Sequence, residues 1–286
     1  MTVYNAYHDI RNLLSVSCES PDFEAGCIVE HITGISHTSL PIMKGQELSA
    51  EAFESLNELA KRRSGGYPLQ YLLGEWDFLD LTLSVGEGVL IPRPETELLC
   101  ETAVSLLPDG KVNVLDLCAG SGCVGLGIAS LRRNVNIAAI ELSDAAMVYL
   151  RHNCERYPAL NITPVFGDVL QGADSLRDSI AKSFDAIVSN PPYIPSGDIG
   201  DLSSEVKCEP AMALDGDSDG LVFYGAIARH WLPLLRCGGF AAVEIGIGQS
   251  EDVCGIFRDA GLRDITVKKD YSGIDRIVYG WKLLHT

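Results

Sequence analysis

Four consecutive residues, Asn190-Pro191-Pro192-Tyr193, combine the groups needed to hold a planar NH₂ group. The two prolines restrict φ and lack a backbone N–H, so the segment is stiff and its carbonyls remain free to accept hydrogen bonds. Asn190 adds a side-chain carbonyl, and Tyr193 adds an aromatic face that can stack on a flat group. We therefore interpret Asn190, Pro191, Pro192 and Tyr193 as a pocket for an amide or amino NH₂. The alternative is an ordinary turn at the end of a strand.

A glycine-rich segment that begins at Asp116 predicts a site for a nucleotide-like ligand. Gly120 and Gly122 let the backbone approach a ligand closely, and the helix that follows offers free N–H groups. With Gly125 they also spell G-x-G-x-x-G, and Glu141 lies about 20 residues further on, as in dinucleotide-binding dehydrogenases. The D-x-x-x-G-x-G arrangement from Asp116 is instead seen in methyltransferases, where a carboxylate near the loop can help to hold the ammonium group of S-adenosylmethionine. The loop alone leaves both cofactors open and favours S-adenosylmethionine.

Two acidic residues follow the next predicted strands. The carboxylate of Glu141 would accept hydrogen bonds from ribose hydroxyls with either cofactor, unless it is a solvated surface glutamate. Asp168 lies where a further loop would reach an adenine ring, but it could equally cap a helix over residues 169–176.

The glycine loop and the Asn-Pro-Pro-Tyr segment together predict methyl transfer to a planar nitrogen. An amide nitrogen is a poor nucleophile because its lone pair is delocalised into the carbonyl. Fixed acceptors that favour the positive charge developing at nitrogen would lower the barrier. No general base of high pKa is needed, because an N-methylated amide cation loses its proton readily. The segment does not distinguish adenine or cytosine of nucleic acid from glutamine of a protein.

The elements that position these groups follow from the hydrophobic pattern. The chain has a helical pattern to about Gly74, clearest over residues 49–63, which Ser49 would cap and Gly65-Gly66 would end. Residues 76–83 alternate as strands do and predict a hairpin. We therefore expect a small helical domain over residues 1–74, a hairpin linker over 75–92 and a methyltransferase domain over 93–286.

From Lys111 onward, short apolar runs alternate with helical stretches, one of them over residues 126–131, which implies right-handed crossovers and a parallel sheet. The runs cover residues 112–117, 135–140, 162–166, 186–189 and 240–245. Residues 265–268 and 276–281, joined by Ser272-Gly273, suggest an antiparallel pair at one edge. The predicted fold is α/β: a seven-stranded, Rossmann-like class I methyltransferase sheet with a small N-terminal helical domain.

Composition restricts the partners. The 286 residues include 22 Lys+Arg and 39 Asp+Glu, a formal net charge of −17, which opposes docking on a phosphate backbone. Nine cysteines occur without a C-x-x-C pair, so we expect reduced thiols and no metal site. Residues 1–18 lack the apolar core of a signal peptide, and no apolar run approaches the length of a membrane span. We expect a cytoplasmic protein with no direct nucleic-acid or membrane partner.

The chain resembles the HemK/PrmC family, the peptide chain release factor N5-glutamine methyltransferases, over nearly its whole length. Besides Asn-Pro-Pro-Tyr, the resemblance is carried by Arg63, residues 66–74 (Gly-Tyr-Pro-Leu-Gln-Tyr-Leu-Leu-Gly), residues 89–97 (Val-Leu-Ile-Pro-Arg-Pro-Glu-Thr-Glu), Glu209-Pro210 and Glu244-Ile245-Gly246. The most family-specific part is Ile-Pro-Arg-Pro-Glu-Thr-Glu.

The resemblance implies that S-adenosyl-L-methionine is the cofactor and that class I peptide chain release factors are the protein substrate. The methylated group would be the glutamine of their Gly-Gly-Gln motif, and the helical N-terminal domain would help to seat the partner. Asn190, Pro191 and Tyr193 would be the catalytic residues. The implied cofactor site consists of Cys118, Ala119, Gly120, Ser121, Gly122, Glu141, Asp168, Val169 and Asn190.

Two residues depart from the family pattern. Cys118 stands where the family usually has glycine, so it would need an unstrained φ and room beside the ligand. Glu141 stands where aspartate is common, and its longer side chain can still reach a ribose. Arg93, Pro94 and Thr96 would either close over the cofactor or anchor the hairpin to the sheet.

Two other functions remain open at this point. A DNA or RNA amino-methyltransferase could use the same pocket after flipping a base out of its stack, although the negative charge opposes it. A non-catalytic nucleotide-binding module would leave the stiff acceptor pocket without a purpose.

Overall fold

The computed structural model describes residues 1–176 and 178–283. They form two compact units, and each is described here by itself. The first consists of Met1–Glu75 together with Ser203–Cys208, and the second of Trp76–Leu202 together with Glu209–Thr286. No helix in the described ranges is both long enough and apolar enough to cross a membrane.

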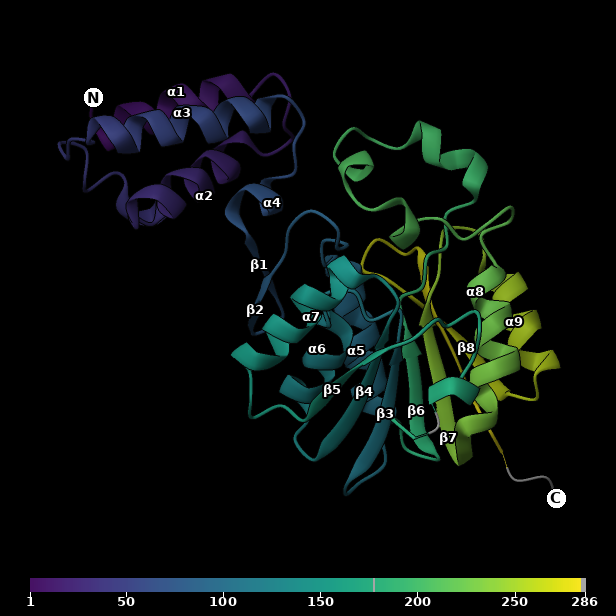
Figure 1. Ribbon diagram of the computed structural model, residues 1–286. Helices are drawn as coiled ribbons and strands as arrows, with labels where there is room; N and C mark the ends of the chain where they lie inside the picture. Colours follow the sequence, from purple (N-terminus) through teal and green to yellow (C-terminus); the bar gives the residue numbers. More distant parts are fainter. Residues whose placement is uncertain (177, 284–286) are drawn as a thin grey trace. The chain divides into compact units, whose positions relative to one another are not determined.

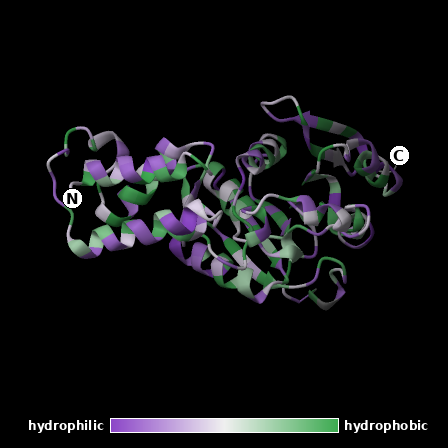
Figure 2. Ribbon diagram, turned by 90° about the horizontal axis from the view of Figure 1, so that it is seen from above, coloured by the Kyte–Doolittle hydropathy of each residue, from purple (hydrophilic) through white to green (hydrophobic). Residues whose placement is uncertain are grey.

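The first unit is helical. Its α-helices are α1 (Val3–Leu14), α2 (Pro21–Thr33), α3 (Ala50–Ser64) and α4 (Leu69–Leu73), and its 3₁₀ turns are η1 (His37–Ser39) and η4 (Val206–Cys208). Helices α1, α2 and α3 pack on one another, and hydrophobic residues line the sides that face each other (Figure 2). Ser49 caps α3 by accepting a hydrogen bond from the Ala52 N–H at 3.1 Å, and Gly65 follows the last helical residue. The helix predicted over residues 49–63 is confirmed.

A buried arginine joins three parts of this unit. The guanidinium of Arg63, on α3, donates to Glu24 of α2 at 2.5 Å and to Glu205 of the Ser203–Cys208 segment at 2.7 Å. Burial lowers the pKa of Arg63, but the hydrogen bonds and charges of the two glutamates outweigh it and raise that pKa above its ordinary value. Arg63 therefore stays charged and ties Ser203–Cys208 to the helices.

The second unit is built on the predicted seven-stranded sheet, in the order β5-β4-β3-β6-β7-β9-β8 (Figure 1). The strands are β3 (Val112–Leu117), β4 (Val135–Glu141), β5 (Ile162–Phe166), β6 (Phe184–Ser189), β7 (Leu235–Glu244), β8 (Arg263–Lys269) and β9 (Asp275–Trp281). Strands β3 to β7 are parallel, and β9 runs antiparallel to both β7 and β8. The predicted mostly parallel sheet with one reversed strand is confirmed. Strands β1 (Glu75–Phe78) and β2 (Leu81–Ser84) form the predicted hairpin.

Helices cover both faces of the sheet, so its strands are apolar on both sides. One face carries α5 (Pro94–Leu106), α6 (Cys123–Leu131) and α7 (Asp144–Arg156), and the other carries α8 (Val222–Ala226), the π-helical turn η6 (Ile227–Trp231) and α9 (Ser250–Asp259) (Figure 1). Alternation along β3 sends Val112 and Val114 toward α5 and α6, and Leu115 and Leu117 toward the opposite core.

The remaining 3₁₀ turns are η2 (Asp174–Leu176), η3 (Ser196–Asp201), η5 (Ala211–Ala213) and η7 (Leu232–Leu234). Helix α6 begins at Cys123 rather than at residue 126, because Gly122 takes a left-handed φ of +85° and turns the chain directly into the helix. Residues 169–176 form a turn followed by η2, not the α-helix considered above.

Candidate active site

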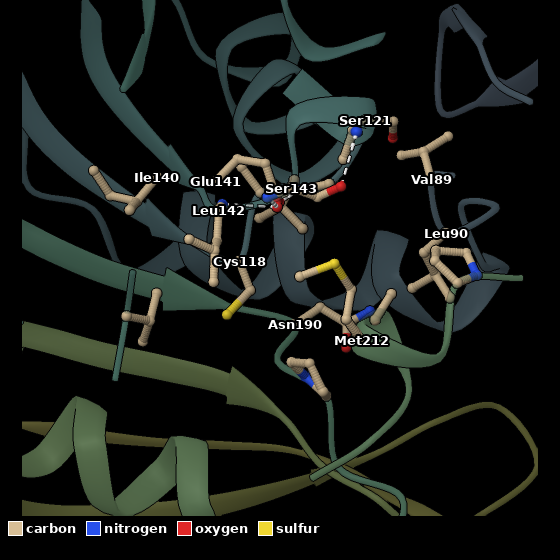
Figure 3. Close-up of a pocket in the computed structure, with 18 of the residues that line it drawn as sticks. Val89, Leu90, Cys118, Ser121, Ile140, Glu141, Leu142, Ser143, Asn190 and Met212 are labelled. Atoms are coloured by element: carbon tan, nitrogen blue, oxygen red, sulfur yellow. Dashed lines mark hydrogen bonds between the residues drawn. The ribbon is translucent and has the colours of Figure 1, made fainter. Parts of the chain in front are cut away.

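The parallel strands β5, β4, β3 and β6 end at the same edge of the sheet, and a cavity opens there (Figure 3). The space between its walls, including the part open to solvent, is about 980 Å³. From the strand ends and α5–α8 come Thr96, Cys118, Ala119, Gly120, Ser121, Cys123, Val124, Ile140, Glu141, Leu142, Ser143, Ala146, Gly167, Asp168, Val169, Leu170, Asn190, Pro192 and Phe223. The opposite wall consists of Gly88, Val89, Leu90, Pro92, Arg93, Pro210, Met212 and Ala213.

The loop after β3 turns sharply through three residues with positive φ. Gly120 and Gly122 take φ of +56° and +85°, and a Cβ on Gly122 would approach a methyl group of Leu150 to 2.6 Å, so both the backbone conformation and this contact favour glycine at position 122. A Cβ on Gly120 would meet nothing within 4 Å, because its backbone borders open space. Cys118 takes φ of +59°, in the left-handed region, so the unstrained φ that a cysteine would need here is not present. The turn that glycine usually makes is made here by a residue with a side chain.

Glu141 holds this loop with its carboxylate. Oε2 accepts a hydrogen bond from the Gly120 N–H at 2.7 Å, and Oε1 accepts from the N–H groups of Leu142 and Ser143 at 2.8 and 2.7 Å. The residue is only 9% exposed and lines the cavity (Figure 3). Glu141 is therefore not a solvated surface residue, and Oε2 keeps a lone pair for a further donor.

The other two predicted carboxylates lie in different environments. Asp168 and Val169 line the cavity, and Asp168 Oδ1 accepts from the Leu170 N–H at 2.8 Å, which shapes a turn. Asp116 is absent from the described lining residues, because strand alternation points it toward α6, where Oδ2 accepts from the Gly125 N–H at 2.9 Å. Asp116 is therefore not placed in the wall of the cavity, where a carboxylate that helps to hold a ligand's ammonium group would be expected. Complete burial raises the pKa of Asp116 to about 8, despite the Gly125 hydrogen bond.

The Asn-Pro-Pro-Tyr segment follows β6, which Ser189 fixes by donating to the Leu117 carbonyl at 2.7 Å. Asn190 and Pro192 line the cavity, whereas Pro191 and Tyr193 are not among its described lining residues. The Gln249 side-chain amide donates to the Tyr193 carbonyl at 2.9 Å. Burial raises the pKa of the Tyr193 hydroxyl, and the charge of Glu244 raises it further, so this hydroxyl stays protonated.

The sequence did not predict how the opposite wall is held. The Ile91 N–H donates to Glu209 Oε2 at 3.0 Å, and the Arg93 guanidinium donates to Glu209 Oε1. Through these two hydrogen bonds Glu209, which is 5% exposed, joins the segment before α5 to the segment after η4. Both segments belong to motifs that were recognised in the sequence. Arg93 and Glu209 are 116 residues apart in the sequence, however, so no local pattern indicated that they are in contact.

No group of three or more His, Cys, Asp or Glu side chains arranged to hold a metal ion occurs within residues 1–176 and 178–283.

Residues 5–74 match the PrmC N-terminal domain model, and residues 95–205 match the methyltransferase small domain model. A release factor glutamine methyltransferase of Geobacter sulfurreducens is 36% identical over 263 residues, which cover 92% of this chain and 90% of that protein. One of Caulobacter vibrioides is 36% identical over 272 residues, covering 94% and 92%. The chain belongs to the release factor glutamine methyltransferase family.

Family membership decides between the two interpretations of the glycine loop: this is a methyltransferase, not a dehydrogenase. A solved methyltransferase structure from Pyrococcus furiosus covers 72% of this chain and 91% of that chain, with a TM-score of 0.53 and 17% identity, so it shares the fold. The α/β class I architecture is therefore established by the sheet order and by this likeness.

Proposed function

We propose that this protein transfers a methyl group from S-adenosyl-L-methionine to the side-chain amide nitrogen, N5, of the glutamine in the Gly-Gly-Gln motif of class I peptide chain release factors. The observation that carries the proposal is the position of Asn190, whose side chain stands in the wall of the cavity that the glycine loop and Glu141 also line. The relatives from Geobacter and Caulobacter, named release factor glutamine methyltransferases, support the substrate.

The cavity suits the proposed cofactor. Gly120 leaves open space beside the backbone, and Glu141 Oε2 can accept a hydrogen bond from a ribose hydroxyl. The cofactor supplies an electrophilic methyl group. The residues that we assign to its site are Cys118, Ala119, Gly120, Ser121, Gly122, Glu141, Asp168, Val169 and Asn190, of which all but Gly122 are among the described lining residues of the cavity.

The chain's own contribution to the reaction is orientation. Asn190 Oδ1 and the Pro191 carbonyl would accept the two N–H groups of the glutamine amide, while Pro192 and Tyr193 complete the pocket. Two fixed acceptors hold the amide plane and stabilise positive charge as it develops on nitrogen. The proton then leaves the N-methylated amide without a strong base.

The partner would be recognised outside the cavity. We assign partner seating to the helical domain over residues 1–74, followed by the hairpin linker over 75–92 and the catalytic domain over 93–286. Class I release factors act in translation termination, so we place the enzyme in the cytoplasm.

The proposal is tested with purified protein, labelled S-adenosylmethionine and a class I release factor, followed by peptide mapping. We expect label on the glutamine of the Gly-Gly-Gln motif and none on a release factor in which alanine replaces that glutamine. Asn190→Ala should lower turnover by about 10²- to 10³-fold, because a preorganised acceptor is lost. Label on duplex DNA or RNA but not on the release factor would favour the nucleic-acid alternative and reject the proposal.

A further inference from the structure

Asn190 is held from behind by a short chain of hydrogen bonds that ends at a buried carboxyl group. Its Nδ2 group donates to Thr96 Oγ1 at 3.0 Å, and the Thr96 hydroxyl donates to Glu244 Oε2 at 2.7 Å. Thr96 and Glu244 are each 1% exposed. These hydrogen bonds connect the first turn of α5, the end of β7 and the segment after β6. Water has almost no access to Thr96 and Glu244.

The direction of these bonds determines which atom of Asn190 is left for the cavity. An ionised carboxylate can only accept hydrogen bonds. The single O–H of Thr96 is therefore used in the hydrogen bond that it donates to Glu244. Thr96 Oγ1 must then accept from Asn190, which requires the amide nitrogen to face Thr96. The carbonyl Oδ1 is left for the cavity that Asn190 lines. A flipped amide would present donors to a substrate NH₂ that also brings donors.

We propose that Thr96 and Glu244 are positioning residues for methyl transfer, which together fix the Asn190 amide with its oxygen toward the substrate nitrogen. The inference rests on the proposed function for the identity of the substrate. The orientation of Asn190 itself is a property of this chain and can be measured without any substrate.

The chain of hydrogen bonds reverses when Glu244 takes up a proton. Burial raises the pKa of Glu244 to about 7, while the Thr96 hydrogen bond and the charge of Arg276 act to lower it. A proton on Oε2, the oxygen that faces Thr96, makes Glu244 the donor to Thr96; Thr96 then donates outward, and the Asn190 amide turns its nitrogen toward the cavity. Turnover should therefore increase as the pH rises through 7, where Glu244 ionises.

Few other groups near Glu244 change charge in this range. The titratable and charged groups that face it are Glu95 and Cys100 of α5, Cys123 of α6, Tyr193, Tyr224 of α8 and Arg276 of β9. Burial raises the pKa of both tyrosines and both cysteines above their ordinary values, so they stay neutral. The positive charge of Arg276 acts to lower the pKa of Glu244, and Glu95 lies exposed on the first turn of α5.

The first test compares two substitutions of Thr96. Thr96→Val keeps the shape but removes the hydroxyl, whereas Thr96→Ser keeps the hydroxyl and removes a methyl group. We expect Thr96→Val to lower kcat by about 10- to 100-fold, somewhat less than loss of the Asn190 acceptor itself, and Thr96→Ser to restore most of it. The ratio of wild-type to Thr96→Val turnover should rise with pH through 7, because only the wild type couples Asn190 to Glu244. Equal losses in both variants, with a ratio that does not change with pH, would indicate a packing role and overturn the proposal.

The second test needs no substrate. In protein with ¹⁵N-labelled asparagine, the Asn190 side-chain NH₂ signals, identified by their absence in Asn190→Ala, should shift with a midpoint near pH 7. Glu244→Gln should abolish this titration, and so should Thr96→Val if it folds. Asn190 signals that do not change between pH 5.5 and 8.5 would overturn the proposal even if the release factor is methylated. A clear titration without methylation of the release factor would support the orientation by Thr96 and Glu244 and reject the proposed function instead.

Discussion

Cys118 occupies a backbone conformation that strains any residue with a Cβ. Its φ of +59° lies in the left-handed region, in a loop that must turn beneath the cavity. For an ordinary L-residue this conformation costs about 1 kcal/mol, which glycine avoids. Cys118 is partly buried, and desolvation raises the pKa of its thiol well above the ordinary value, so it is not a reactive thiolate. The cysteine therefore contributes packing at the wall of the cavity at the expense of backbone strain.

This strain can be measured with two substitutions of Cys118. Both Cys118→Ala and Cys118→Gly remove the sulfur, but only alanine keeps the Cβ and hence the strain. We expect the glycine variant to be more stable than the alanine variant by about 1 kcal/mol in urea-induced unfolding. A glycine variant that is equal to or less stable than the alanine variant would show that the loop is relaxed around Cys118.

Glu141 shapes its loop before any ligand arrives, because three backbone N–H groups donate to its carboxylate. We expect Glu141→Ala to weaken S-adenosylmethionine binding by about 1.5 to 3 kcal/mol, since a charged acceptor for the ribose is lost. Isothermal titration calorimetry measures this change, with Glu155→Ala on the exposed side of α7 as a charge-matched control. Affinity unchanged from wild type in Glu141→Ala would reject the assignment of Glu141 to the ribose.

At the scale of elements, Arg63 couples the chain segment before the sheet to one that comes more than a hundred residues later. It lies on α3 with its side chain 4% exposed, and its partners are Glu24 of α2, 12% exposed, and Glu205, 42% exposed. Removing the Arg63 cation leaves the carboxylate of Glu24, which is nearly buried, without its partner. Removing one member of a buried ion pair strongly destabilises a protein, because the remaining charge is uncompensated.

We expect Arg63→Ala to lower the free energy of opening of α2 and α3 by about 3 kcal/mol. Glu205→Ala should cost less than about 1 kcal/mol, because Glu205 is well exposed and solvent screens its charge. Hydrogen exchange followed by mass spectrometry, mapped to peptides of α2 and α3, measures both. Equal and small effects in the two variants would show that the Arg63–Glu24 pair does not hold these helices.

The elements of the sheet were predictable because each strand is a short apolar run with turn residues at its ends. Strand β7 begins five residues before its predicted start at residue 240. Its first part was not predicted because exposed residues around Gly238 interrupt the apolar run. The orientation of single side chains was harder to predict. Asp116 ends an apolar strand beside the glycine loop, yet the two-residue period of the strand points it to the α6 side.

The candidate site was predictable where chemistry and position coincide in one short segment. Gly120 of the glycine loop, Glu141, Asp168 and Asn190 were found in this way, and the structure brings these four residues to one cavity. The Arg93–Glu209 contact and the Thr96–Glu244 support of Asn190 were not found. Their partners lie 116 and 148 residues apart, and only the folded sheet brings them together.

For the molecule as a whole, the excess of acidic residues makes the protonation of the few buried carboxyl groups important. Most of the 39 acidic side chains have access to solvent, but Asp116 and Glu244 are each 1% exposed. Burial raises the pKa of Asp116 to about 8 and that of Glu244 to about 7. The folded protein therefore binds protons at these sites that the unfolded chain has already released.

This difference predicts how stability depends on pH. A carboxyl group whose pKa is raised by folding favours the folded state while it is protonated, and this contribution is fully present below the unfolded value near pH 4. For Asp116 it is lost as the pH rises toward 8, and for Glu244 as it rises toward 7. Each group can lower the free energy of unfolding by up to about 1.4 kcal/mol per pH unit within its window. The protein should therefore become less stable between pH 5 and 8, the reverse of the trend for carboxylates in ion pairs.

Asp116→Asn separates this effect from the general repulsion among the negative charges. The amide can still accept the Gly125 hydrogen bond but cannot ionise, so the decrease in stability with pH should become shallower by about 1 kcal/mol per pH unit. Asp109→Asn makes the same change of charge at an exposed turn and should leave the slope as in the wild type. Urea-induced unfolding at pH 5, 6, 7 and 8 gives the three slopes, which do not depend on the absolute stability of each variant. If the Asp116→Asn slope equals that of Asp109→Asn, then Asp116 is ionised in the folded protein throughout this range, and its charge must be balanced by a group other than the Gly125 N–H.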